Sequence, residues 1–518
     1  TAGERVSDQA ELLAHHYGEA LDLSRSAGVS EDLSSLEDTT RRWWVVAGER
    51  AMTLDVVRAG ECFDRALALT PPGHPDRADI VARNGAASYD AGRYQDAEAA
   101  YEEALRLYRE TGDLLAVGTC LDRLATVLWE EGNPDASQAS LAEALDVLEG
   151  QPHGTELADC YSSLASERTV SGHLEEAVTW ADRSLALSTE LGADRMKPRA
   201  LAYRGAARSL LGDLGGVDDL EEALRIAENL GLARDSVMPL LILAEIAWAT
   251  DGPERAIETA LKAGELGGRR GLGEIVIASR TTRLGPLFEI GRWDELLDLT
   301  REVIEWSAGA GAEYEIATAR PWEARVLLLR GRLDEASAAA DDFMPLARHV
   351  GDPQVLVPAA VAAGSIALAQ QRFDDAAGLI EEVESAADVS AWYREHYVAD
   401  LVRLCIDTGN LAAAERIIDR SEAFTTRHRM SLVTADAVMH EAKGEFQIAG
   451  SRYLEAAPEW ESYGNVLEHA NALLGAGRCL ASTGEPARDH LSRARDILAK
   501  LGAASLLQES ESLLRNAE

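Results

Sequence analysis

Apolar residues recur three and four positions apart along the chain, which is the spacing that places side chains on one face of an α-helix. Segment 99–107 shows this pattern at Ala99, Ala100, Ala104, Leu105 and Leu107. Segment 141–148 repeats it. Alternation of apolar and polar residues, which is typical of a half-buried strand, is not seen. The pattern predicts amphipathic helices throughout and therefore an all-α fold.

Glycine separates these helices at a regular interval. Because glycine accepts the left-handed conformation on which many helices end, each interval is interpreted as one helix and its turn. The inner turns of successive helix pairs lie about 40 residues apart, at Gly92, Gly132, Gly172, Gly212, Gly252, Gly291, Gly331, Gln371, Gly409, Gly444 and Gly484. This interval predicts an alpha-alpha superhelix of about twelve antiparallel helix pairs.

Departures from the interval suggest how the chain is organised. Near Leu54 the spacing holds without a glycine, and after Gln371 the spacing contracts. We therefore expect a helical cap or linker over 1–53 and regular repeats over 54–370. Repeats with shortened spacing and a C-terminal capping helix are expected over 371–518.

Small and bulky residues recur at fixed offsets from the inner turns. A small residue lies seven positions before the turn, alanine lies five after it, and an aromatic or aliphatic residue lies nine after it. Examples are Gly85, Ala125 and Ala165; Ala97, Ala177 and Ala336; and Tyr101, Leu141 and Tyr453. This combination resembles the tetratricopeptide repeat, whose usual period is 34 residues. We interpret the longer interval as longer helices and loops. The resemblance favours, as a hypothesis for the chain, a protein-interaction or sensor module.

A broader resemblance spans the whole chain. The opening segment 10–23 (AELLAHHYGEALDL) and the closing segment 494–503 (ARDILAKLGA) are similar to the carboxy-terminal half of large bacterial signalling ATPases. In those proteins a nucleotide cyclase or a LuxR-like DNA-binding domain is joined to an AAA/STAND-type ATPase and then to a tetratricopeptide array. The resemblance implies that the array senses a ligand, protein or peptide and regulates an ATPase or cyclase domain in the same polypeptide.

Charge and composition narrow the classes of partner. The chain has 50 Lys and Arg against 89 Asp and Glu, and a net charge of −39. Nucleic acids and anionic membranes both attract basic surfaces, so neither is expected as a partner of this segment. There is no run of 18 apolar residues, and the five cysteines form no C-x-x-C pair. We therefore predict a cytoplasmic protein without a disulfide framework.

Motifs that carry catalysis are missing from the sequence. No lysine follows a glycine, so a phosphate-binding P-loop is excluded, and neither His-Glu-x-x-His nor Gly-x-Ser-x-Gly occurs. The adjacent His15 and His16 point about 100° apart on a helix and are poorly placed to share a metal ion. We predict no catalytic residue, no metal and no cofactor. An enzyme built from scattered carboxylates and arginines remains as a minor alternative.

Polar residues also interrupt the helix face that should pack. Eight positions before the inner turn, where leucine is expected, the chain has Asn84, Arg204, Arg283, Glu323 and Asp436. An unpaired buried charge is costly, so each of these positions implies a partner, exposure or a site. Arg283 and Glu323 lie one period apart on stacked helices, a spacing that allows them to face one another.

Arginine and tryptophan gather around these two positions. Arginine beside tryptophan is a common surface for binding carboxylates and planar ligands. This favours, as an alternative function, a small-molecule receptor with a pocket in the middle repeats. The candidate ligand-binding residues are Arg280, Arg283, Arg320, Trp322, Glu323 and Arg325.

The concave face of the superhelix offers a second candidate site. In such arrays it is lined by first-helix positions ten, six and three residues before the turn. In the early repeats these positions form a polar groove with two aromatic residues, namely Tyr89, Asp122, Thr126, Trp129, Ser162 and Ser166. In the middle repeats they become apolar. Such a groove suits an extended peptide if the superhelix is open, and a small ligand if it closes on itself.

Overall fold

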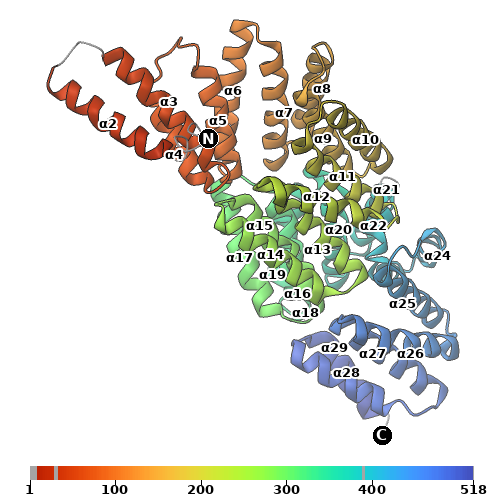
Figure 1. The fold of residues 1–518 in the computed structure, drawn as a ribbon. Coiled ribbons are helices and arrows are strands. Elements are labelled where there is room, and N and C mark those ends of the chain that lie inside the picture. The colour runs from red at the N-terminus through yellow and green to blue at the C-terminus, as the bar shows by residue number, and fades with distance from the viewer. Residues whose placement is uncertain (1–8, 29–32, 388–390, 517–518) are drawn as a thin grey trace.

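The computed structural model describes residues 9–28, 33–387 and 391–516, and all regular structure within these ranges is helical. In these ranges twelve helix pairs follow one another and build the predicted alpha-alpha superhelix, which is of the tetratricopeptide type (Figure 1). Two further helices flank the array, α2 (Ala10–Ser26) and α29 (Ala504–Asn516). The predicted all-α fold is confirmed.

The first six pairs occupy the N-terminal half of the chain. They are α3 (Leu33–Ala51) with α4 (Val56–Ala68), α5 (Arg77–Asp90) with α6 (Tyr94–Thr111), α7 (Leu114–Glu130) with α8 (Pro134–Glu149), α9 (Thr155–Val170) with α10 (Leu174–Glu190), α11 (Lys197–Leu210) with α12 (Gly216–Leu230), and α13 (Met238–Thr250) with α14 (Pro253–Arg269). Two short 3-10 helices, η1 (Asp194–Met196) and η2 (Arg234–Ser236), precede α11 and α13.

The last six pairs include two whose first helix is broken. They are α15 (Gly273–Thr282) and α16 (Leu284–Glu289) with α17 (Trp293–Ala310), α18 (Glu313–Leu329) with α19 (Leu333–Val350), α20 (Pro353–Ala369) with α21 (Phe373–Ala387), α22 (Ala391–Glu395) and α23 (Val398–Asp407) with α24 (Leu411–Arg420), α25 (Thr426–Ala442) with α26 (Phe446–Tyr463), and α27 (Val466–Thr483) with α28 (Arg488–Leu501).

A proline explains the break between α15 and α16. Pro286 has no N–H, and its ring conflicts with the carbonyl of Thr282, the residue at which α15 ends. Arg283 therefore lies at the break and not on a continuous packing face. Its guanidinium donates to Glu295 at 3.1 Å.

The other polar residues on the packing face also have partners. Asn84 donates to Asp64 at 2.8 Å, Arg204 binds Asp219 at 2.6 Å, and Asp436 binds Arg452 at 2.9 Å. Glu323 accepts from Arg320, three residues earlier on the same helix, at 2.8 Å. Arg283 and Glu323 therefore each bind another residue, and the pairing between them that their spacing allows does not form.

The superhelix closes on itself. Helix α5 contacts α15, α7 contacts α18, α13 contacts α25, α16 contacts α27 and α18 contacts α29. The first four of these contacts join helices that are five pairs apart, so five pairs complete one superhelical turn. In Figure 1 the orange, green and blue parts of the chain lie one below another as a result. A backbone hydrogen bond from Val56 N to Arg270 O, at 3.2 Å, also links successive turns.

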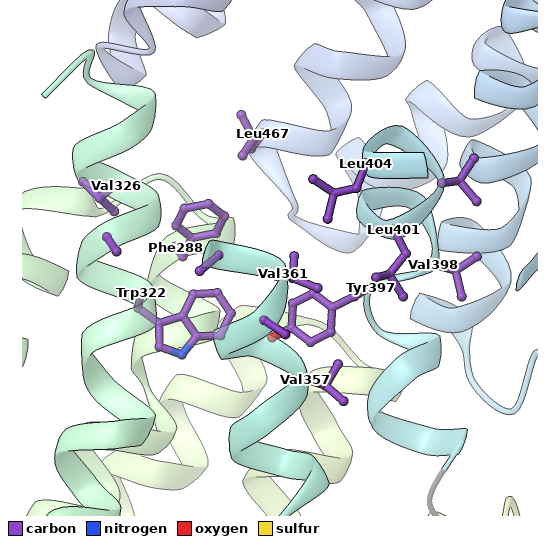
Figure 2. Packing of buried hydrophobic residues seen from close by; sticks show 14 of the residues in the cluster. Phe288, Trp322, Val326, Val357, Val361, Tyr397, Val398, Leu401, Leu404 and Leu467 are labelled. Carbon is purple, nitrogen blue, oxygen red and sulfur yellow. The ribbon is translucent and has the colours of Figure 1, made fainter. Parts of the chain in front are cut away.

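The largest hydrophobic core lies in the C-terminal half. Figure 2 shows Phe288 and Trp322 facing Val357 and Val361 of α20, with Tyr397 and Leu401 on the other side. All five cysteines are free and buried. No helix in the described ranges is long and apolar enough to cross a membrane.

Candidate ligand-binding chamber

The first superhelical turn encloses a chamber of about 610 Å³. The inner helices α5, α7, α9, α11, α13, α15 and α18 provide its wall, and residues of α20 and α22 contribute at one end. The contacts of α5 with α15 and of α7 with α18 close the ring. Volumes of 300–1,000 Å³ are typical of small-molecule sites, so the chamber has the size of a ligand pocket.

One part of the chamber wall carries three arginines held by acidic residues. Arg123 and Arg199 both bind the carboxylate of Asp159, and the Arg199 contact is 3.2 Å long. Burial alone would raise the pKa of Asp159, but the two guanidinium groups hold it below its usual value. Asp159 therefore stays ionised and fixes both arginines in place.

Arg234 joins the two edges of the closed ring. Its Nη2 donates to the hydroxyl of Tyr89 on α5 at 2.7 Å and to Glu274 on α15 at 2.9 Å. Its guanidinium also lies 4.6 Å from the centre of the Tyr89 ring. Since α5 and α15 are five helix pairs apart, Arg234 ties one turn of the superhelix to the next at the chamber wall.

A second group of residues joins the edges α7 and α18. The rings of Trp129 and Tyr314 lie 4.4 Å apart, and Glu130 accepts from Tyr89 at 3.3 Å. Burial and the charge of Glu274 raise the pKa of Glu130 well above its usual value. Burial also raises the pKa of Glu315 to about 7, although Thr281 donates a hydrogen bond to it.

Glu245, like Asp235 of η2, forms no hydrogen bond or ion pair with any residue in the described ranges. Its side chain on α13 is exposed to the chamber. The surrounding protein still removes much of its water, which raises its pKa to about 7, while the charge of Arg427 opposes this shift.

The predicted groove residues lie in two environments. Tyr89, Thr126, Trp129 and Ser166 line the chamber. Asp122 and Ser162 do not: they are 2% and 1% exposed and lie between packed helices. The Ser162 hydroxyl is hydrogen-bonded to Ser184 at 2.9 Å.

Of the predicted arginine and tryptophan cluster, Trp322 alone lines the chamber. Arg280 binds Glu302 at 3.5 Å, and Arg325 binds Asp400 at 3.0 Å and lies over the Phe288 ring. Together with the Arg283–Glu295 and Arg320–Glu323 pairs, these contacts place the arginines of the cluster in ion pairs along the array. Trp322 itself packs against Phe288, with ring centres 5.5 Å apart, and belongs to the core.

Arg199, Arg234 and Glu245 were not predicted from the sequence. One signal was available, because the position thirteen residues before each inner turn extends the concave stripe by one helical turn. This position lines the chamber in five successive repeats, at Asp159, Arg199, Pro239, Ala278 and Thr318. Arg234 lies in η2, outside any first helix, so no repeat offset identifies it.

No group of three His, Cys, Asp or Glu side chains arranged to hold a metal ion occurs in the described part of the chain. The arginine part of the chamber is suited to planar anionic groups, because guanidinium presents several donors in one plane. The aromatic part is suited to apolar or cationic groups.

Comparisons with solved structures find other helical-repeat proteins. The APC/C hetero-tetramer Cut9-Hcn1 is similar over 96% of this chain and 98% of that one, with 14% identity and a TM-score of 0.47. A STAND protein with a tetratricopeptide repeat sensor from Pyrococcus horikoshii is similar over 64% of this chain and 55% of that one, with 12% identity and a TM-score of 0.38. The Rap protein complexed with Competence and Sporulation Factor is similar over 79% and 99%, with 12% identity and a TM-score of 0.39.

No curated protein matches the chain in sequence. A family model described as tetratricopeptide repeat matches residues 76–150, which contain the α5–α6 and α7–α8 pairs. The inner turns of both pairs have glycine, at Gly92 and Gly132. Residues 76–150 are thus similar to tetratricopeptide repeats and lie within an all-α superhelix of that type.

Proposed function

We propose that this chain is a non-catalytic sensor module whose chamber binds a small molecule or a short peptide segment. The observation that carries the proposal is the enclosure of the chamber by helices from two successive superhelical turns. An occupant would contact both edges of the closed ring and would therefore stabilise the closed form over any more open form. A ligand shifts a conformational equilibrium only through such differential contacts.

The chemistry of the wall supports binding over catalysis. The chamber histidine, His396, is hydrogen-bonded to the Trp392 carbonyl at 3.0 Å and to His428 at 2.9 Å. Burial lowers its pKa well below the usual value, so the ring is neutral. In the ranges that the structure describes, no serine or cysteine of the chamber is hydrogen-bonded to it, and a nucleophile–base pair of that kind is therefore not formed.

The output of the sensor is proposed to pass to a protein partner, an ATPase or cyclase domain in the same polypeptide. The similarity of segments 10–23 and 494–503 to the array of bacterial signalling ATPases supports this part of the proposal. The complete reading frame tests it. An ATPase segment upstream of Thr1 would support the regulatory role, whereas a reading frame that encodes no nucleotide-binding domain would overturn it.

Binding in the chamber is tested by thermal unfolding of the whole chain against a defined panel of sugars, carboxylates, amines and short peptides at millimolar concentration. The matched control is Ser166→Trp combined with Ile242→Trp, because both side chains line the chamber and are only half-buried. At least one compound should raise the melting temperature of the wild type and not that of the double variant. Stabilisation that is equal in both proteins, or absent throughout the panel, contradicts the proposal.

A further inference from the structure

The aromatic part of the chamber holds one carboxylate for which the protein provides no partner. Glu245 faces the chamber from the middle of α13, and the neighbouring side chains Ile242 and Trp248 on the same helix also line it. No described residue donates a hydrogen bond to Glu245 or forms an ion pair with it. A carboxylate in such surroundings is costly unless a cation or donor approaches it.

The cationic side chain that acts on Glu245, Arg427, already has partners of its own. Arg427 binds Glu289 at 2.6 Å and donates to the carbonyl of His396 at 2.8 Å. Its guanidinium also lies 4.8 Å from the centre of the Trp248 ring. Arg427 thus lowers the electrostatic cost of Glu245 only from a distance, through a Coulombic interaction.

Four aromatic side chains also line the chamber. Tyr393 and Trp392 of α22 line it together with Trp248 and Trp322. The charge of Glu245 contributes to the raised pKa of Tyr393, so the phenol lies within electrostatic range of the carboxylate. Aromatic faces attract organic cations, and the attraction is larger where water is excluded.

The chamber lining as a whole contains more acidic than basic side chains. Its described lining contains seven carboxylates, Asp90, Glu130, Asp159, Glu167, Asp235, Glu245 and Glu315, against four arginines, Arg123, Arg195, Arg199 and Arg234. Three of these arginines are held in ion pairs at the other part of the wall. An anionic ligand near Glu245 would therefore meet a wall in which carboxylates outnumber arginines.

We propose that Glu245 and the aromatic side chains of Tyr393, Trp392, Trp248 and Trp322 form a subsite for an organic cation, an ammonium group carried on an apolar or aromatic body. This inference rests on the proposed sensor function and specifies the class of ligand. The ammonium group approaches the Glu245 carboxylate, and the apolar body lies against the aromatic rings. The arginine part of the chamber remains available for a second, polar group of the same ligand.

The pH dependence of binding follows from the groups around the subsite. Tyr393 on α22 and Arg427 on α25 both interact electrostatically with Glu245, and the chamber histidine His396 is neutral. Tyr393 and Arg427 do not change charge between pH 6 and pH 8, because the pKa of each is above its usual value. Glu245, with a pKa of about 7, does change, so cation affinity should increase across this range.

Three probes of one shape test the proposal: phenylbutylamine, phenylbutanol and phenylbutyrate. Binding to the whole chain is followed by calorimetry and by the fluorescence of the chamber tryptophans. At pH 8 we expect the amine to bind about tenfold more tightly than the alcohol, and the acid to bind most weakly. Glu245→Gln should remove the preference for the amine and leave alcohol binding unchanged. Glu254→Gln, the same change at an exposed position outside the chamber, should retain the preference.

The results for the three probes distinguish failure of the cation subsite from failure of the chamber. The ranking of the three probes on the wild type is independent of whether the Glu245 variant folds. An acid that binds as well as the amine, or an amine preference that survives Glu245→Gln, would overturn the cation subsite, as would failure of all three probes to bind. If the probes bind without preference and the Ser166→Trp, Ile242→Trp double variant abolishes that binding, the cation subsite is wrong and the sensor chamber stands. Binding that the double variant does not change would contradict the chamber itself.

Discussion

The indole of Trp306 lies against the backbone of Gly92, although 214 residues separate them in the chain. A Cβ atom added to Gly92 would come within 2.3 Å of Trp306 Cζ2. The same relationship recurs at three consecutive inner turns further along the chain: Gly212 faces Phe424, Gly252 faces the Tyr463 carbonyl, and Gly291 faces Leu501. These four glycines therefore have two roles. They end the first helix, and their missing side chains admit the next superhelical turn.

Gly92→Ala should therefore destabilise the protein through two effects. Its φ of +77° is costly for alanine, and the new methyl group would overlap the Trp306 ring. We expect a loss of about 3 kcal/mol in the free energy of unfolding. Gly112→Ala is the matched control, because Gly112 has a φ of +75° and no atom within 4 Å of the added Cβ. It should lose about 1 kcal/mol from backbone strain alone. Equal losses in urea unfolding would show that Gly92 has no packing role between turns.

The Arg427–Glu289 ion pair joins α25 to α16 and is buried, with side chains 7% and 2% exposed. Glu289 also accepts from the Trp248 indole at 2.8 Å. Glu289→Gln should cost about 3–5 kcal/mol, because it leaves the Arg427 charge buried and unpaired. The control is Glu382→Gln, which breaks a pair with Arg348 whose side chain is 54% exposed, and which should cost at most about 1 kcal/mol. Chemical denaturation measures the free energy of unfolding of both variants. If Glu289→Gln loses no more of this free energy than Glu382→Gln does, Arg427 does not depend on Glu289 to balance its charge.

Gln371 stands where the repeat has glycine, and it retains the left-handed backbone with a φ of 61°. Gln371→Gly should stabilise the protein by about 0.5–1 kcal/mol, because relief of backbone strain exceeds the greater freedom of glycine in the unfolded chain. Gln370→Gly is the control. Gln370 has a φ of −88°, and its side chain donates to Ser337 at 2.8 Å, so this change should destabilise. Thermal melts that show Gln371→Gly to be destabilising would exclude strain at this turn.

Gln371 also shows what the sequence could predict. The interval of turns is local information, and it was enough to predict the helix pairs and to place Gln371 at an inner turn. The chamber depends on contacts such as Arg234 with Tyr89, which are 145 residues apart. Those contacts form because five successive helix pairs add up to one full rotation, and the rotation per pair is set by packing details that no single repeat displays. The sequence therefore predicted four groove residues that line the chamber. It predicted neither the closure of the chamber nor the presence of Glu245 in its wall.

Glu245 should make the stability of the protein depend on pH near neutrality. Its pKa in the folded chain is about 7, above the ordinary value of 4.5, so the folded state binds the proton more tightly than the unfolded state does. The resulting cost is complete above pH 7 and disappears as the pH falls toward 4.5. Because the side chain is open to water in the chamber, we expect a cost of only about 1 kcal/mol at pH 8.

Glu245→Gln removes the ionisable group, and so it should raise the melting temperature relative to wild type at pH 8 and leave it unchanged near pH 4.5. The exposed control Glu254→Gln should show no such pH-dependent difference, because no desolvated carboxylate is removed. Thermal melts of the three proteins across this range test the sign of the effect. If Glu245→Gln instead destabilises the protein at pH 8, the carboxylate has a stabilising partner in the folded chain, and the chamber does not present an uncompensated charge to its ligand.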